Sequence, residues 1–148
     1  MDRAACLALF DGNVPDYFHA TEREAFGEFL ESSDYRPPRL RQNPGDARFY
    51  VLQDKDAILG CGGWYLEDDI AGLTWGIVSR AQHGKGLGRV LLQERLKIVR
   101  KDGRAKSVRV RTTPKIQGFF EHFGFRLVRK NLVGVVDEVP LVELLVTL

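Results

Sequence analysis

Apolar and polar positions alternate with two different periods along this chain. Between residues 47 and 79, three β-branched and aromatic runs are separated by short polar turns, which is typical of an antiparallel meander. These runs are ARFYVLQ (47–53), AILGCGGWYL (57–66) and AGLTWGIVS (71–79). The period becomes helical over 88–102, where Leu92, Leu96 and Val99 share one face and Gly103 follows the last turn.

The flanking segments complete the predicted element order. The apolar run ACLALF (4–9) predicts a short buried strand. A capping box of Thr21 and Glu24 then predicts a helix that ends near Ser32, and a loop with three prolines follows it over 35–46. The remaining predictions are a strand at 106–113, a helix opened by Pro114 at 114–123, and closing strands at 125–132 and 141–148.

The expected order is therefore β-α-β-β-β-α-β-α-β-β, in which the helix 88–102 is long enough to be a parallel crossover. This order indicates an α/β fold with a mixed central sheet and flanking helices. A length of 148 residues favours one domain over residues 1–148.

Composition excludes several classes of protein. No apolar run reaches the roughly 18 residues that a membrane span needs, so no membrane association is expected. Cys6 and Cys61 form neither a disulfide framework nor a metal motif, and each is expected to be a buried free thiol. With no recognisable export signal, we expect a cytoplasmic protein without a metal.

The net charge of +2 hides a strong asymmetry. Residues 1–79 carry seven Lys or Arg and 14 Asp or Glu, a balance of −7, whereas residues 80–130 carry 15 and three, a balance of +12. A basic segment attracts an anionic partner, either nucleic acid or a phosphorylated small molecule. Nucleic acid is disfavoured because Phe119, Phe120, Phe123 and Phe125 have the spacing of core residues rather than of an exposed stacking platform.

A glycine-rich loop lies between the strand that ends near Ser79 and the helix that begins near Gly88. Glycines let backbone N–H groups approach a ligand, and a helix N-terminus favours an anion. Lys85 and Arg89 add positive charge, so the loop predicts a polyphosphate site. A Walker A loop is excluded because Gly86 follows Lys85, and a dinucleotide fingerprint is excluded because Arg89 replaces its last glycine.

The loop His83-Gly84-Lys85-Gly86-Leu87-Gly88 resembles motif A of the GCN5-related N-acetyltransferase (GNAT) family, whose usual form is Q/R-x-x-G-x-G/A. The segment GFFEHFGF (118–125) is similar to a second marker of that family. The resemblance extends over essentially the whole chain and implies a domain that transfers an acetyl group from acetyl-CoA to an amine.

The resemblance also implies roles for individual residues. The cofactor pyrophosphate is expected on the loop, the pantetheine arm beside the backbone of Ile77 and Val78, and the pantetheine or the thiol near Thr113 and Phe120. An N–H near Val78 is expected to polarise the thioester carbonyl. The loop residues are His83, Gly84, Lys85, Gly86, Leu87, Gly88 and Arg89.

Three departures from the family pattern affect the chemistry. His83 replaces a Gln or Arg, and Phe120 replaces the tyrosine that protonates the leaving thiolate in many members. The strand before motif A carries Gly72 and Thr74 where some members have a catalytic glutamate. The candidate general bases are therefore Glu67, Asp68 and Asp69 in the turn that follows 57–66, or a chain of water molecules. Glu67 is the first of them to test, and for each carboxylate the alternative is an ordinary turn residue.

Two functions remain open at this stage. The first is direct acetyl transfer from acetyl-CoA to an amine, with a small molecule favoured over a protein N-terminus or a lysine as acceptor. The second is a catalytically weak acyl-CoA-binding or sensor domain, which the missing tyrosine and glutamate suggest. A homodimer is compatible with the sequence, which does not specify the oligomeric state.

Overall fold

The computed structural model describes residues 3–14, 16–18, 20–31, 47–133 and 140–148. A six-stranded sheet, in the order β1-β2-β3-β4-β6-β5, forms its centre. The strands are β1 (Ala47–Asp54), β2 (Ala57–Glu67), β3 (Ile70–Val78), β4 (Ser107–Thr112), β5 (Arg126–Val133) and β6 (Pro140–Thr147). The predicted meander and both closing strands are confirmed, and the sheet is mixed as expected.

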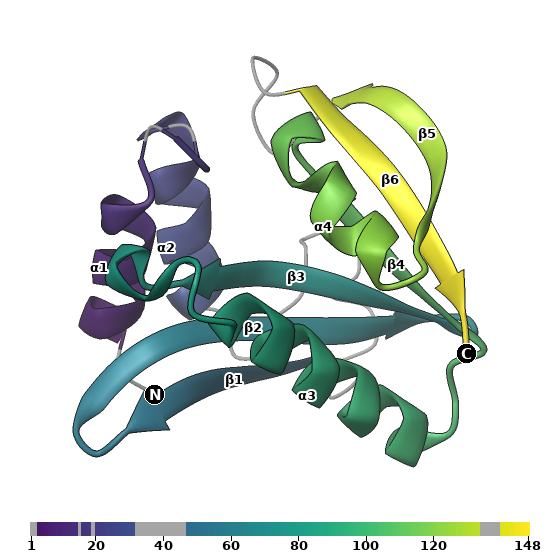
Figure 1. Ribbon diagram of the computed structural model, residues 1–148, viewed down its shortest axis with the longest axis horizontal. Helices are drawn as coiled ribbons and strands as arrows, with labels where there is room; N and C mark the ends of the chain where they lie inside the picture. The colour runs from purple at the N-terminus through teal and green to yellow at the C-terminus, as the bar shows by residue number, and fades with distance from the viewer. Residues whose placement is uncertain (1–2, 15, 19, 32–46, 134–139) are drawn as a thin grey trace.

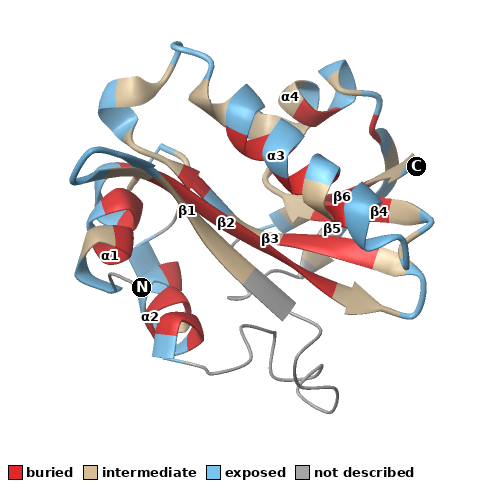
Figure 2. Ribbon diagram, turned by 90° about the horizontal axis from the view of Figure 1, so that it is seen from below, coloured by how far each residue is buried: buried red, intermediate tan, exposed pale blue. Residues whose placement is uncertain are grey.

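Two layers of helices cover the sheet. Helices α1 (Arg3–Gly12) and α2 (Arg23–Glu31) lie on one face, whereas α3 (Leu87–Asp102) and α4 (Gln117–His122) lie on the other (Figure 2). Short 3-10 turns precede three of these helices: η1 (Ala20–Glu22), η3 (Arg80–Gln82) and η4 (Pro114–Ile116). The predicted loop over 35–46 and the end of the helix near Ser32 fall outside the described residues.

The predicted strand at 4–9 is wrong, because this segment is the helix α1. Its buried residues Cys6, Leu7, Leu9 and Phe10 repeat at helical spacing and pack against α2 and the sheet. A six-residue apolar run does not distinguish a strand from a buried helix, and alanine and leucine both favour the helix. The observed order is thus α-α-β-β-β-α-β-α-β-β.

Each face of the sheet has its own hydrophobic cluster. On the α3 side, Leu92, Leu96 and Val99 pack with sheet residues such as Val108 and Leu144, which confirms the predicted helical stripe. On the α1 side, Phe10, Phe26 and Phe29 pack with Cys61 and Ile77. Gly103 ends α3 with φ 82°, in the left-handed conformation that favours glycine.

The crossover β3-α3-β4 is parallel, as predicted. Strands β3 and β4 pair only over Ile70–Leu73 and Ser107–Val110, although β3 continues to Val78 and β4 to Thr112. Beyond Leu73 the two strands diverge, β3 toward α1 and α2 and β4 toward the far end of β6 (Figure 1). Beyond Leu73, this edge of β3 pairs with no strand of the described residues.

Candidate active site at the splay between β3 and β4

The glycine loop closes the end of β3 and begins α3. Gly84 and Gly86 have φ values of 78° and 85°, and a Cβ atom built on either would meet nothing within 4 Å. Because Gly86 is the N-cap residue of α3 and has no side chain, the first N–H groups of the helix gain no side-chain cap. Lys85 and Arg89 are exposed beside them. The loop can therefore present free N–H donors and two cations to an anion.

His83 is oriented by the end of β3. Its Nε2 lies 3.0 Å from the carbonyl oxygen of Val78, so this nitrogen carries a proton and donates it. The Val78 carbonyl also accepts a hydrogen bond, 3.0 Å long, from the buried Asn13. The remaining ring nitrogen of His83 can donate to a phosphate only when the imidazole is protonated.

A bulge in β3 lies between the paired and the splayed parts of this strand. Trp75 and Gly76 together oppose Gly62, since Gly63 pairs with Thr74 and Cys61 pairs with Ile77. Trp75 has φ 45°, which is unusual for a bulky residue. Bulges of this kind redirect backbone groups and are frequent beside active sites. Here the side chain of Ile77 is buried on the α1 face, whereas Val78 is half-buried.

The 118–125 segment meets the glycine loop in space. A Cβ atom on Gly88 would lie 3.6 Å from the ring of Phe119, so the first turn of α3 packs against α4. Phe120 is 8% exposed and lies between the rings of Phe119 and Phe125. Its phenyl ring cannot donate a proton.

Thr113 follows β4 and precedes η4. Its hydroxyl oxygen Oγ1 is buried and has no hydrogen-bond partner among the described residues. A buried hydroxyl without a partner is costly, so a ligand group in the splay would satisfy it.

Asp16 and Tyr17 join the open ends of the two diverging strands. Asp16 forms an ion pair with Arg80, which follows β3, and its backbone oxygen accepts a hydrogen bond from Lys115, which follows β4. The hydrogen bond from Arg80 lowers the pKa of Asp16. The ring of Tyr17 contacts His83 edge-on and lies 4.3 Å from the Lys115 ammonium. This segment therefore borders the entrance to the splay.

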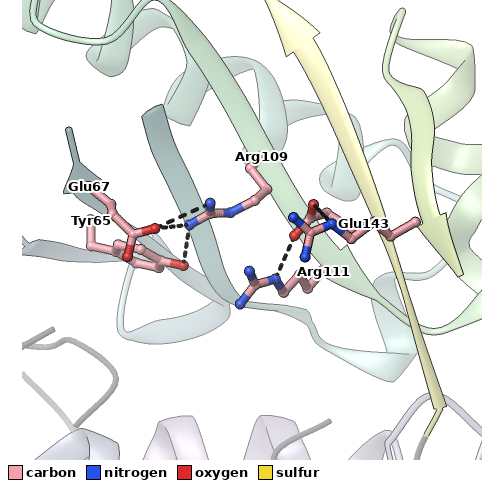
Figure 3. A network of polar contacts seen from close by, with 6 residues as sticks. Tyr65, Glu67, Arg109, Arg111 and Glu143 are labelled. Carbon is pink, nitrogen blue, oxygen red and sulfur yellow. Dashed lines mark hydrogen bonds and ion pairs between the residues drawn. The ribbon is translucent and has the colours of Figure 1, made fainter. Parts of the chain in front are cut away.

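Glu67 lies in a polar network on the α1 face of the sheet. Its Oε1 is 3.4 Å from both terminal nitrogens of Arg109, and Arg109 also donates to the hydroxyl of Tyr65 at 3.1 Å (Figure 3). Burial disfavours the charge of Arg109, but Tyr65 and Glu67 outweigh this effect, so the pKa of Arg109 is raised. Glu67 is opposite Ile70, at the closed end of the β3–β4 pair. The splay begins four residues further along β3, about 13 Å away at 3.3 Å per residue.

A second ion pair continues this network across the sheet. Arg111 donates from Nε to Glu143 at 2.8 Å (Figure 3). Arg129 lies 3.5 Å from the same carboxylate. Glu143 is buried, and the guanidinium groups of Arg111 and Arg129 compensate its charge. This pair was not predicted from the sequence, although the alternation of Arg109 and Arg111 in one strand places both on one face.

The structure thus brings the loop 83–89, Val78, Thr113 and Phe120 around the splay and leaves Glu67 at the opposite end of β3. Within the described ranges, no group of three or more His, Cys, Asp or Glu could hold a metal ion. None of the described helices is both long and apolar enough to cross a membrane.

A model of the acetyltransferase (GNAT) domain matches residues 45–127 of this sequence. Because this match covers more than half of the chain, the protein belongs to the GNAT acetyltransferase family. No curated protein matches the sequence.

Solved structures agree on the fold. A GNAT-family protein from Desulfovibrio desulfuricans superposes with a TM-score of 0.76 at 17% identity, over 99% of this chain and 92% of that chain. An aminoglycoside 6'-N-acetyltransferase complexed with coenzyme A gives 0.69 at 12% identity, over 98% and 89%. A GNAT acetyltransferase from Elizabethkingia anophelis with acetyl-CoA bound gives 0.65 at 15% identity, over 87% and 85%. These structures share the architecture that positions the splay.

Proposed function

We propose that this chain binds acetyl-CoA in the splay between β3 and β4 and transfers the acetyl group to an amine. The main support is the N-terminus of α3. There Gly84 and Gly86 have positive φ and nothing within 4 Å of a Cβ position, and they follow the part of β3 that no longer pairs with β4. Coenzyme A and acetyl-CoA bound to GNAT neighbours of the same fold support this proposal.

The residues around the splay fit such a ligand. We assign the pyrophosphate to the N–H groups from Gly84 to Arg89, except that of Lys85, which donates to the carbonyl oxygen of Gln82. The side chains of Lys85 and Arg89 are the counter-charges, and His83 is a further donor when protonated. The pantetheine arm would lie along the free edge of β3 beside Ile77 and Val78. The unpartnered hydroxyl of Thr113 and the ring of Phe120 would face it from the β4 side.

When bound, acetyl-CoA supplies an acyl group activated as a thioester. The chain would hold its carbonyl by an N–H near Val78 and admit the amine past Asp16 and Tyr17. The acidic balance of residues 1–79 favours a cationic acceptor, for which we propose a small-molecule amine.

For the general base we propose Glu67. Its side chain is about one-third exposed, and its remaining oxygen can accept a proton. Because it lies far from the start of the splay, proton removal would proceed through water molecules.

Calorimetry with CoA tests the proposed site. Gly86→Glu fills the approach to the helix N-terminus and adds a negative charge, so we expect no measurable binding. Gly103→Glu is a matched control, because Gly103 has nearly the same φ and equally open surroundings at the other end of α3. Unchanged affinity in Gly86→Glu would exclude the loop as the site.

A sensor domain that binds acyl-CoA without turnover is the second candidate. It is favoured by the buried Phe120, which supplies no proton for the leaving thiolate. A panel of amines with acetyl-CoA distinguishes the two, since binding without thiol release for every amine would support the sensor.

We also infer a single domain in a reducing, cytoplasmic setting. One continuous sheet includes both halves of the described chain, and the buried Cys6 and Cys61 form no disulfide.

A further inference from the structure

Arg95 occupies the middle of α3 and points into the sheet. It is 5% exposed. A Cβ atom on Gly62 would lie 3.1 Å from its Cζ, and one on Gly76 would lie 2.7 Å from its Nη2. These are the residues that face each other at the bulge, so the two glycines provide the space for the guanidinium.

The charge of Arg95 has little compensation. Its one hydrogen bond with a described residue runs from Nη1 to the carbonyl oxygen of Gly63 at 3.3 Å, and its Nε has no partner. Among the described residues no carboxylate forms an ion pair with it. The thiol of Cys61 lies near enough to interact with the charge of Arg95, but the pKa of this thiol is itself raised, so it is neutral. Burial lowers the pKa of Arg95 to about 10, so the guanidinium is still charged near neutral pH.

A buried cation without an anion is expensive. Its position shows where an anion would compensate it. Gly76 is three residues beyond the last β3–β4 pair and is exposed at the splayed edge of β3. Because Gly76 has no side chain, it places none between the guanidinium and the splayed edge of β3.

We propose that Arg95 is the fixed cation of the acyl-transfer site and stabilises negative charge on the leaving sulfur across the backbone of Gly76. This inference rests on the proposed function. In the transfer, the amine nitrogen bonds to the acetyl carbon, the C–S electron pair goes to sulfur, and the surplus proton of the amine goes to water or to a base. An opposite charge about 4 to 6 Å away lowers the pKa of a thiol by about one unit or more. Sulfur then leaves as a thiolate, and no proton donor is needed where Phe120 stands.

Titration of the thiol of bound CoA tests this role without turnover. Thiolate absorbance is followed against pH, and the same protein without CoA is subtracted to remove its own thiols and tyrosines. In the wild type we expect the thiol pKa of bound CoA to be about one unit or more below that of free CoA in the same buffer.

Three variants separate charge from packing. Arg95→Met keeps a long side chain but removes the charge, and Arg95→Gln removes the charge while retaining a donor for the Gly63 carbonyl. Both should return the bound thiol to the pKa of free CoA. Arg100→Met removes an exposed cation from the same helix and should leave the shift intact.

Two results would overturn the inference. One is a wild-type complex in which the bound thiol titrates like free CoA, and this needs no variant. The other is an unchanged shift in whichever neutral Arg95 variant folds and binds CoA. Wild-type protein that fails to bind CoA in calorimetry refutes the proposed function and this inference together, whereas binding with an unshifted thiol refutes this inference alone.

Discussion

Cys61 is held at the bulge by contacts that oppose its ionisation. The hydrogen bond with Cys6, together with burial, raises the pKa of the Cys61 thiol well above its ordinary value of 9.0. At a pH above about 9, an unfolded chain loses this proton while the folded one keeps it. The folded state then binds more protons than the unfolded state. The contribution of this thiol to stability is therefore complete below that pH and is lost as the pH rises.

We therefore expect the free energy of unfolding of the wild type to fall between about pH 7.5 and 9.5 more steeply than that of Cys61→Ala. Urea denaturation at these two pH values measures the difference. The lost packing in Cys61→Ala lowers stability equally at both, so only the slope is informative. Parallel slopes would mean that the thiol ionises normally in the folded protein.

Strand β3 carries a steric constraint at Gly72 that was not evident from the sequence. Gly72 was noted only as the absence of a catalytic glutamate. The structure gives it a positive role, since its cross-strand partner is Tyr65 and a Cβ atom there would lie 2.3 Å from the Tyr65 ring. Because Gly72 has no side chain, the Tyr65 ring can cross β3 and its hydroxyl can reach Arg109.

Gly72→Ala should therefore displace Tyr65 and destabilise the fold by about 1–3 kcal/mol, as overpacking usually does. Chemical denaturation measures this loss. Gly118→Ala is the comparison, because nothing lies within 4 Å of a Cβ atom there and alanine favours the helix. Equal stability of the two variants would mean that the Tyr65 ring moves without cost.

Element types with a clear period were predictable, whereas contacts between elements were not. The meander and α3 follow from apolar spacing and from Gly103, but the apolar run at 4–9 was too short to reveal its helical period. The glycine loop was evident because its residues are adjacent in the sequence. Arg95 was not, since its meaning depends on Gly62 and Gly76, which only the fold brings together. Its position on the same face as Leu92 and Leu96 was the available signal.

For the whole molecule, acetyl transfer requires a neutral amine, because ammonium has no lone pair. Turnover with a lysine-like amine should rise between about pH 6 and 9, with either a base or the amine itself losing the proton. Glu67→Gln should move or flatten this rise if Glu67 receives the proton. Initial rates of the wild type and Glu67→Gln are measured across this pH range. Superimposable profiles would mean that Glu67 does not receive the proton and has only its structural contact with Arg109.

The short pairing of β3 with β4, over Ile70–Leu73 and Ser107–Val110, also affects where the sheet opens locally. We call this pairing the seam. β1, β2 and β3 are held together along most of their length, and so are β4 and β6. Backbone pairing joins these two halves over four residues of each strand only, so we expect the hydrogen bonds of this pairing to open more easily than those within either half. Amide hydrogen exchange should then be faster at Ile70–Leu73 and Ser107–Val110 than in the middle of β2. CoA that bridges the halves should slow exchange most at that seam. Equal protection of the amides across the sheet would instead mean that they exchange only by global unfolding.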